Sequence, residues 1–125
     1  MPILIALAAL ASSPPSCTHE LVRTAKSVRG DEAIEEIRVC DLGPYVTTGQ
    51  NQIFLRIKRS PRPVLIARLE SVGRKGVPLS WEGKTLIVHL PVHYHGSSLQ
   101  VIHRHLAGVS LTFIRDYSDE EQLRD

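Results

Sequence analysis

Turn-forming residues interrupt this chain at short intervals, and this spacing limits what it can fold into more than any other feature. Clusters of Gly, Pro, Ser and Asn recur every eight to twelve residues or so, a spacing typical of all-β domains. Between them, apolar side chains often take every second position, as Ile53, Leu55 and Ile57 do, which places one side of a strand in a core. At 125 residues and 42% hydrophobic composition, the chain has room for one compact domain. We predict an all-β fold, a single small antiparallel sandwich or barrel-like sheet of about six to eight short strands. Residues 33–39 could also form one short helix.

The first residues have the character of an export signal. Residues 2–11, PILIALAALA, are apolar and end in a small-x-small pattern, which resembles the apolar and cleavage regions of a signal peptide. The run is too short for a membrane-spanning helix, so no transmembrane helix is expected. We predict a signal peptide over 1–11, a linker over 12–16, a β domain over 17–115 and an acidic flexible tail over 116–125. The alternative is an N-terminal strand or helix buried in the fold, because no Lys or Arg precedes the apolar run.

The chain has two cysteines, Cys17 and Cys40. An even number of cysteines in an exported protein favours a disulfide. If the chain folds back at a four-residue turn over Ser27 to Gly30, paired positions sum to 57, and the two cysteines lie directly opposite each other. The chain-entropy model assigns such a bridge about 3.4 kcal/mol. We therefore predict a disulfide and a periplasmic or secreted protein; the alternative is two buried free thiols in a cytosolic protein.

Several short motifs carry a resemblance to a known group of proteins. They are Cys17 with Glu20-Leu21, the turn over 27–30, Cys40, Gly43, Thr47-Thr48 and Trp81-x-Gly83-Lys84-Thr85-Leu86. In these motifs the chain resembles an uncharacterised family of small exported bacterial proteins with a Cys, a Ser-Pro-Asp-Gly turn and a Cys-Gly-x-Thr segment. Val28-Arg29 replaces Pro-Asp here, and Asp41-Leu42 separates Cys40 from Gly43. The resemblance implies export and a series of strands, but no activity.

Five of the six histidines lie between Thr85 and Leu106. We predict a β-hairpin there with its loop at Gly96 to Ser98, because this loop has turn chemistry. A three-residue loop would place all five histidines on one face, with His89 opposite His105. A two- or four-residue loop would flip the second strand and scatter them. Pro91 lacks a backbone donor, which indicates an edge strand or a bulge.

Such a face would be a candidate metal site, because imidazole is a ligand for zinc and copper. The predicted ligands are His89, His93, His103 and His105. Two alternatives remain open: exposed strand histidines that bind adventitious metal weakly, and a surface that senses pH.

The second candidate is the basic segment from Arg56 to Lys75, with seven Lys or Arg residues and one acidic residue. We predict a basic patch of Arg56, Lys58, Arg59 and Arg62 that binds a polyanion. For an exported protein the expected partner is an envelope protein or an anionic envelope polymer, and nucleic acid is not expected, because Phe54 is the only stacking aromatic nearby. The alternative is ordinary solvated strand edges, where Lys and Arg discourage aggregation.

The sequence favours binding over catalysis. Ser97 and Ser98 lie near His95 and His103, but no nucleophile turn or orienting carboxylate stands at recognisable spacing. The acidic residues from Asp116 onward are predicted to be a solvated tail. We therefore predict no catalytic residues and a small exported binding or structural module. A metal-binding protein is the main alternative and a hydrolase the third.

Overall fold

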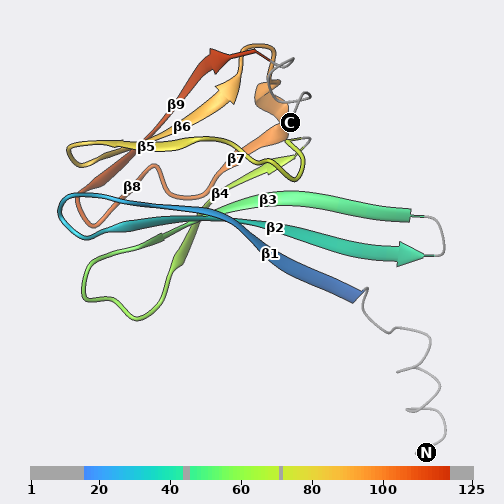
Figure 1. Cartoon of the computed structure of the whole chain (residues 1–125), viewed down its shortest axis with the longest axis horizontal. Coiled ribbons are helices and arrows are strands. Elements are labelled where there is room, and N and C mark those ends of the chain that lie inside the picture. Colours follow the sequence, from blue (N-terminus) through green and yellow to red (C-terminus); the bar gives the residue numbers. More distant parts are fainter. Residues whose placement is uncertain (1–15, 44–45, 71, 119–125) are drawn as a thin grey trace, which may run out of the picture.

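In the part of the chain that the structure describes, nine strands form two stacked sheets (Figure 1). This computed structural model describes residues 16–43, 46–70 and 72–118. The strands are β1 (Ser16–Lys26), β2 (Glu32–Gly43), β3 (Val46–Arg56), β4 (Val64–Glu70), β5 (Leu79–Glu82), β6 (Thr85–Pro91), β7 (Leu99–Val101), β8 (His105–Leu106) and β9 (Val109–Tyr117). Sheet A has the order β1-β2-β3-β4-β7 and sheet B the order β5-β6-β9-β8. The predicted all-β sandwich is confirmed.

Three details differ from the prediction, the first being nine strands in place of about six to eight. Residues 33–39 lie within β2 rather than in a helix, and the only helical element among the described residues is a 3-10 turn over Gly96–Ser98. Every strand pair is antiparallel except β6 with β9, which run parallel. A parallel pair needs a long crossover connection, and the segment between β6 and β9 passes through sheet A as β7 on its way.

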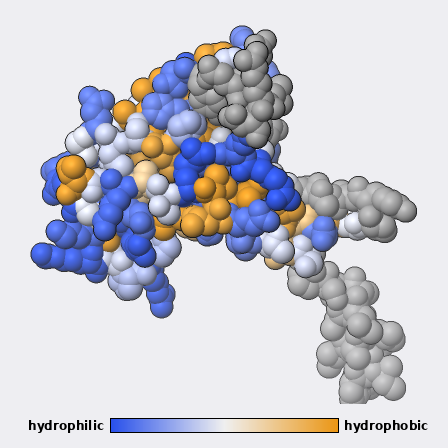
Figure 2. All heavy atoms as spheres, in the orientation of Figure 1, coloured by the Kyte–Doolittle hydropathy of each residue, from blue (hydrophilic) through white to orange (hydrophobic). Residues whose placement is uncertain are grey.

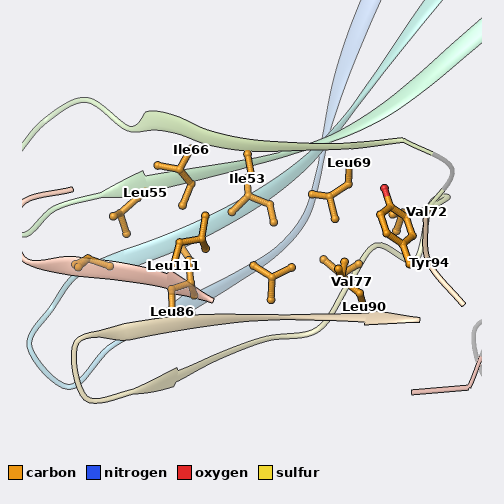
Figure 3. Packing of buried hydrophobic residues seen from close by; sticks show 14 residues of the cluster. Ile53, Leu55, Ile66, Leu69, Val72, Val77, Leu86, Leu90, Tyr94 and Leu111 are labelled. Carbon is orange, nitrogen blue, oxygen red and sulfur yellow. The ribbon is translucent and has the colours of Figure 1, made fainter. Parts of the chain in front are cut away.

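The core fills the space between the sheets (Figure 3). On β6, Leu86, Val88 and Leu90 are fully buried, whereas the residues between them face outward and are half-buried. On β3, Ile53 and Leu55 are fully buried from the other side. The alternation seen in the sequence therefore selects the inward face of these strands.

The first hairpin carries the predicted disulfide. Cys17 lies opposite Cys40 in the β1–β2 pair, and the two are bonded. The turn is one residue longer than predicted, because the Ser27 amide donates to the carbonyl of Asp31 at 2.8 Å. A register shift between Leu21 and Arg23 absorbs this extra residue. The prediction of directly opposed cysteines is confirmed because the bulge compensates for the longer turn.

The ends of β1, β2 and β3 project beyond sheet B (Figure 1). Leu42, near the end of β2, is 51% exposed. A ribbon with little core contributes little hydrophobic stabilisation. The disulfide therefore crosslinks the hairpin where packing is weakest.

A buried carboxylate holds the connection from sheet A to sheet B. Glu35 on β2 is 0% exposed. Its oxygens accept hydrogen bonds from the Val77 amide at 3.1 Å and from Asn51 Nδ2 at 2.9 Å, and Arg23 Nε lies 3.1 Å away. Asn51 Nδ2 also donates to the Gly73 carbonyl at 3.2 Å. The loop between β4 and β5 is thus attached by polar contacts to the inner face of sheet A.

Gly76 shows how closely this loop approaches the carboxylate. A Cβ atom at Gly76 would lie 2.4 Å from both Glu35 oxygens, and its φ of +69° favours glycine as well. Gly73, in the same loop, also has a positive φ, but a Cβ there would meet nothing within 4 Å. Glycine at position 76 is therefore required by contact with Glu35 and not by backbone conformation alone.

The predicted domain boundaries fall partly outside the described residues. Residues 1–11, most of the linker and 119–125 lie outside the described residues. At the other end, β9 continues to Tyr117, so Asp116 belongs to the sheet and not to the predicted tail. Among the described residues, no helix has the length and apolar character needed to cross a membrane.

Replacing Glu35 with Gln tests how the buried carboxyl that holds the β4–β5 loop affects stability at different pH values. Burial raises the pKa of Glu35, an effect that the bonds from Asn51 and Val77 and the charge of Arg23 oppose. The folded state therefore favours the neutral carboxyl, and this stabilisation is lost as the pH rises through the raised pKa. We expect the free energy of unfolding of wild type, relative to Glu35→Gln, to fall as the pH increases from about 4.5. Urea unfolding at several pH values measures it, and a constant difference between the two proteins would contradict it.

Replacing both Cys17 and Cys40 with Ser should lower the free energy of unfolding by about 3 kcal/mol, because the unfolded chain regains the entropy that the crosslink removes. Urea unfolding of the variant and of wild type measures the difference. Wild type treated with a reductant is the matched control and should lose the same amount. A loss well below about 1 kcal/mol would show that the crosslink is not what stabilises this hairpin.

Candidate functional site

The predicted histidine hairpin is wrong. Strand β6 pairs with β5 on one edge and β9 on the other, so no edge remains for the following segment. The chain instead turns at Pro91, whose carbonyl accepts from the Tyr94 amide at 3.0 Å. It then crosses to sheet A, where β7 pairs with β4. The length of the loop at Gly96 to Ser98 therefore does not decide where the histidines lie, since β6 and β7 belong to different sheets.

The predicted metal ligands are consequently separated. His89 lies opposite Ile114 and His105 opposite Ser110, on the two sides of β9. The four-residue offset along β9 corresponds to about 13 Å, in addition to two strand spacings of about 4.8 Å each. His93 is exposed in the turn after β6, and His103 is exposed between β7 and β8. Among the described residues there is no group of three or more His, Cys, Asp or Glu side chains that could hold a metal ion.

The basic segment is also divided by the fold. Arg56 forms an ion pair with Glu32 across the β2–β3 pair. Arg62 is exposed in the turn between β3 and β4. Lys58 and Arg59, in contrast, line a hollow at the end of the sandwich where several turns meet. Figure 2 shows hydrophilic side chains gathered at this end of the molecule, on the left.

We call this feature the basic hollow. It has a volume of about 270 Å³, and its lining residues are Arg29, Asp31, Ile57, Lys58, Arg59, Lys84, Ala107, Gly108 and Val109. Arg29 comes from the β1–β2 turn and Lys84 from the β5–β6 turn, so the fold adds two cations that are distant in sequence from Lys58 and Arg59. Four cations and one carboxylate around one concavity make a site suited to an anion.

The walls of the basic hollow are constrained. The Asp31 carboxylate accepts from the Lys58 amide at 2.9 Å, which joins the β1–β2 turn to the end of β3. The Lys58 stem packs over Gly30, since a Cβ there would lie 3.1 Å from Lys58 Cδ. Two non-glycine residues with positive φ, Arg59 at 73° and Ala107 at 49°, both line the hollow. Unfavourable backbone conformations of this kind cost about 1–3 kcal/mol and cluster at functional sites.

A second group of polar side chains lies on the outer face of sheet B. Ser80 Oγ is 2.7 Å from His89 Nε2, and His89 Nδ1 is 2.7 Å from Asp116 Oδ2. The sequence indicated neither the serine nor the acid. Ser80 and Asp116 are separated from His89 by 9 and 27 residues, and only the pairing of β6 with both β5 and β9 makes them neighbours. The only sign of this group in the sequence was the alternation along residues 85–91, which places His89 on the outward face.

No protein-family model, curated protein or solved structure matches this chain. The resemblance to small exported bacterial proteins therefore stays a prediction. Function has to be inferred from the side chains that the fold places together, chiefly those of the basic hollow.

Replacing Tyr94 with Phe tests how the chain leaves sheet B. Tyr94 Oη lies 2.6 Å from the Glu70 carbonyl and 2.9 Å from that of Ser98, so losing the donor should cost about 1 kcal/mol of unfolding free energy at neutral pH. Burial raises the pKa of Tyr94 to about 12, against about 10 for a free phenol. Above pH 10 or so, wild type should lose stability relative to Tyr94→Phe as the pH rises, because only the unfolded phenol ionises at first. Urea unfolding at pH 8 and pH 11 measures this, and an unchanged difference would contradict it.

Proposed function

We propose that this protein is a small binding module, exported to the periplasm or beyond the cell, that recognises an anionic group through the basic hollow. One observation carries the proposal: Lys58 and Arg59 converge with Arg29 and Lys84 around a single concavity. Export is supported by the Cys17–Cys40 disulfide, because disulfides persist in oxidising compartments.

The dimensions and charge of the basic hollow indicate the class of ligand. A volume of about 270 Å³ is slightly below that of typical small-molecule pockets, which begin near about 300 Å³. It suits one phosphate, sulfate or carboxylate with part of the sugar or polyol that carries it. An envelope polymer with repeated phosphate groups offers such a unit many times, which raises the effective concentration of the ligand.

The arginines and lysines of the basic hollow have different roles in this proposal. Arg29 and Arg59 can donate paired N–H groups to two oxygens of one anion, whereas Lys58 and Lys84 act as point charges. Asp31 opposes anion binding less than a carboxylate without hydrogen bonds would, because it already accepts a hydrogen bond from the Lys58 amide. The interaction is expected to weaken with added salt, as ionic contacts near solvent do.

The proposal predicts that Lys58→Gln combined with Lys84→Gln lowers affinity for a glycerol phosphate polymer by at least about tenfold, because each charged hydrogen bond contributes about 1.5–3 kcal/mol. Glutamine retains much of the side-chain stem, including the part of Lys58 that packs over Gly30. Isothermal titration calorimetry at low and at physiological salt measures the affinity.

The matched control is Arg62→Gln combined with Arg104→Gln. Both arginines are exposed and neither lines the basic hollow, so this variant loses the same net charge. Its affinity should stay within about twofold of wild type, because it weakens only the long-range attraction, which both variants lose equally, and leaves the contacts in the hollow intact. Equal losses in both variants, or no binding by wild type, would contradict a specific site.

A further inference from the structure

Three side chains on the outer face of sheet B form one continuous hydrogen-bonded chain. Ser80 Oγ lies 2.7 Å from His89 Nε2, and His89 Nδ1 lies 2.7 Å from Asp116 Oδ2. We call this group the 80–89–116 relay. Its residues come from β5, β6 and β9, which are adjacent strands of sheet B, so they do not belong to a mobile loop.

The strand register fixes these positions. Ser80 lies opposite Ile87, and His89 lies opposite Ile114. In each case the next member of the relay is two residues further along the neighbouring strand, a diagonal separation that long side chains can span. Val88 and Leu90, on either side of His89, point into the core and are fully buried. The His89 amide also donates to the Pro78 carbonyl at 3.0 Å, which fixes its backbone beside β5.

The chemistry of the three groups determines where the protons lie. An ionised Asp116 can only accept a hydrogen bond, so His89 Nδ1 must carry a proton. In the neutral ring Nε2 is then an acceptor, and the Ser80 hydroxyl must donate to it. This tautomer is the one in which a histidine can remove the serine proton. Ser80 is half-buried and the His89 and Asp116 side chains are 22% and 43% exposed, so a reagent can approach from solvent.

We propose that Ser80 is an activated nucleophile that accepts the acyl group of an ester. Ser80 Oγ attacks the carbonyl carbon while its proton passes to His89 Nε2. The bond to the leaving alkoxide breaks, and the alkoxide takes that proton and departs as an alcohol. Water, deprotonated by His89, then releases the acyl group as a carboxylic acid and regenerates Ser80. Asp116 is a positioning residue in this scheme, because it acts on His89 alone.

A hollow beside Ser80 indicates which acyl groups fit. It has a volume of about 420 Å³, which lies within the range of small-molecule pockets. Apolar lining comes from Ala25, Val28, Leu79 and Trp81, and Lys26 is also part of the wall. An apolar acyl chain suits this lining, and Lys26 adds one positive charge to the wall of the hollow. The substrate class is therefore an ester with a short aliphatic acyl chain.

The test uses an alkyl fluorophosphonate, which reacts with an activated serine as its oxygen displaces fluoride from phosphorus. We expect wild type to gain one phosphonyl group at Ser80, located by peptide mass spectrometry. The labelling rate should fall at least about 100-fold in His89→Gln, because general-base catalysis by a histidine contributes about 10²–10⁴-fold. The labelling rate of Asp116→Asn should fall by a comparable factor. Asp116→Glu should recover part of the rate, and a merely structural contact would not produce that recovery.

The chain contains its own matched control. His105 Nδ1 lies 3.3 Å from Ser110 Oγ on the same sheet, and no carboxylate is paired with His105 among the described ion pairs and hydrogen bonds. Ser110 should remain unlabelled under the conditions that label Ser80, and His105→Gln should not change the rate at Ser80. Circular dichroism of each variant verifies that it is folded. An unlabelled Ser80 in wild type, equal labelling of Ser80 and Ser110, or a rate unaffected by His89→Gln would overturn the proposal.

Discussion

The buried carboxylate of Glu35 is the interaction on which the arrangement of the two sheets depends. It receives the Val77 amide and the Asn51 side chain on the inner face of sheet A, and it has no exposed surface. A carboxylate in such a place destabilises the fold unless its oxygens are bonded. The loop between β4 and β5 supplies the Val77 amide, so the contacts that satisfy Glu35 also hold the chain where it enters sheet B.

Both candidate sites are consequences of where sheet B is placed. The basic hollow needs Lys84 from the β5–β6 turn beside Lys58 and Arg59 at the end of β3. The 80–89–116 relay needs β6 between β5 and β9. A different path for the β4–β5 loop would remove Lys84 from the first site. The polar network around Glu35 thus positions residues that it does not touch.

Local patterns in the sequence predicted strands well and their partners unevenly. The alternation along β6 correctly identified Leu86, Val88 and Leu90 as core residues and His89 as outward. The Cys17–Cys40 pairing was also correct, because the bulge between Leu21 and Arg23 offsets a turn one residue longer than predicted. The histidine hairpin failed because it treated β6 and β7 as sequential partners. Burial of Tyr94 and the occupied edges of β6 send the chain to sheet A instead.

By itself the sequence determined the all-β class, the first hairpin with its disulfide, and which face of each strong strand is apolar. These follow from side-chain alternation and from turns whose effects extend over a few residues. Only the tertiary structure decided that Arg29 and Lys84 join Lys58, and that Ser80 and Asp116 flank His89. Those neighbours come from pairing between strands distant in the chain. That pairing is set by which edges and faces remain uncovered once the core has packed, and alternation within one strand does not encode it.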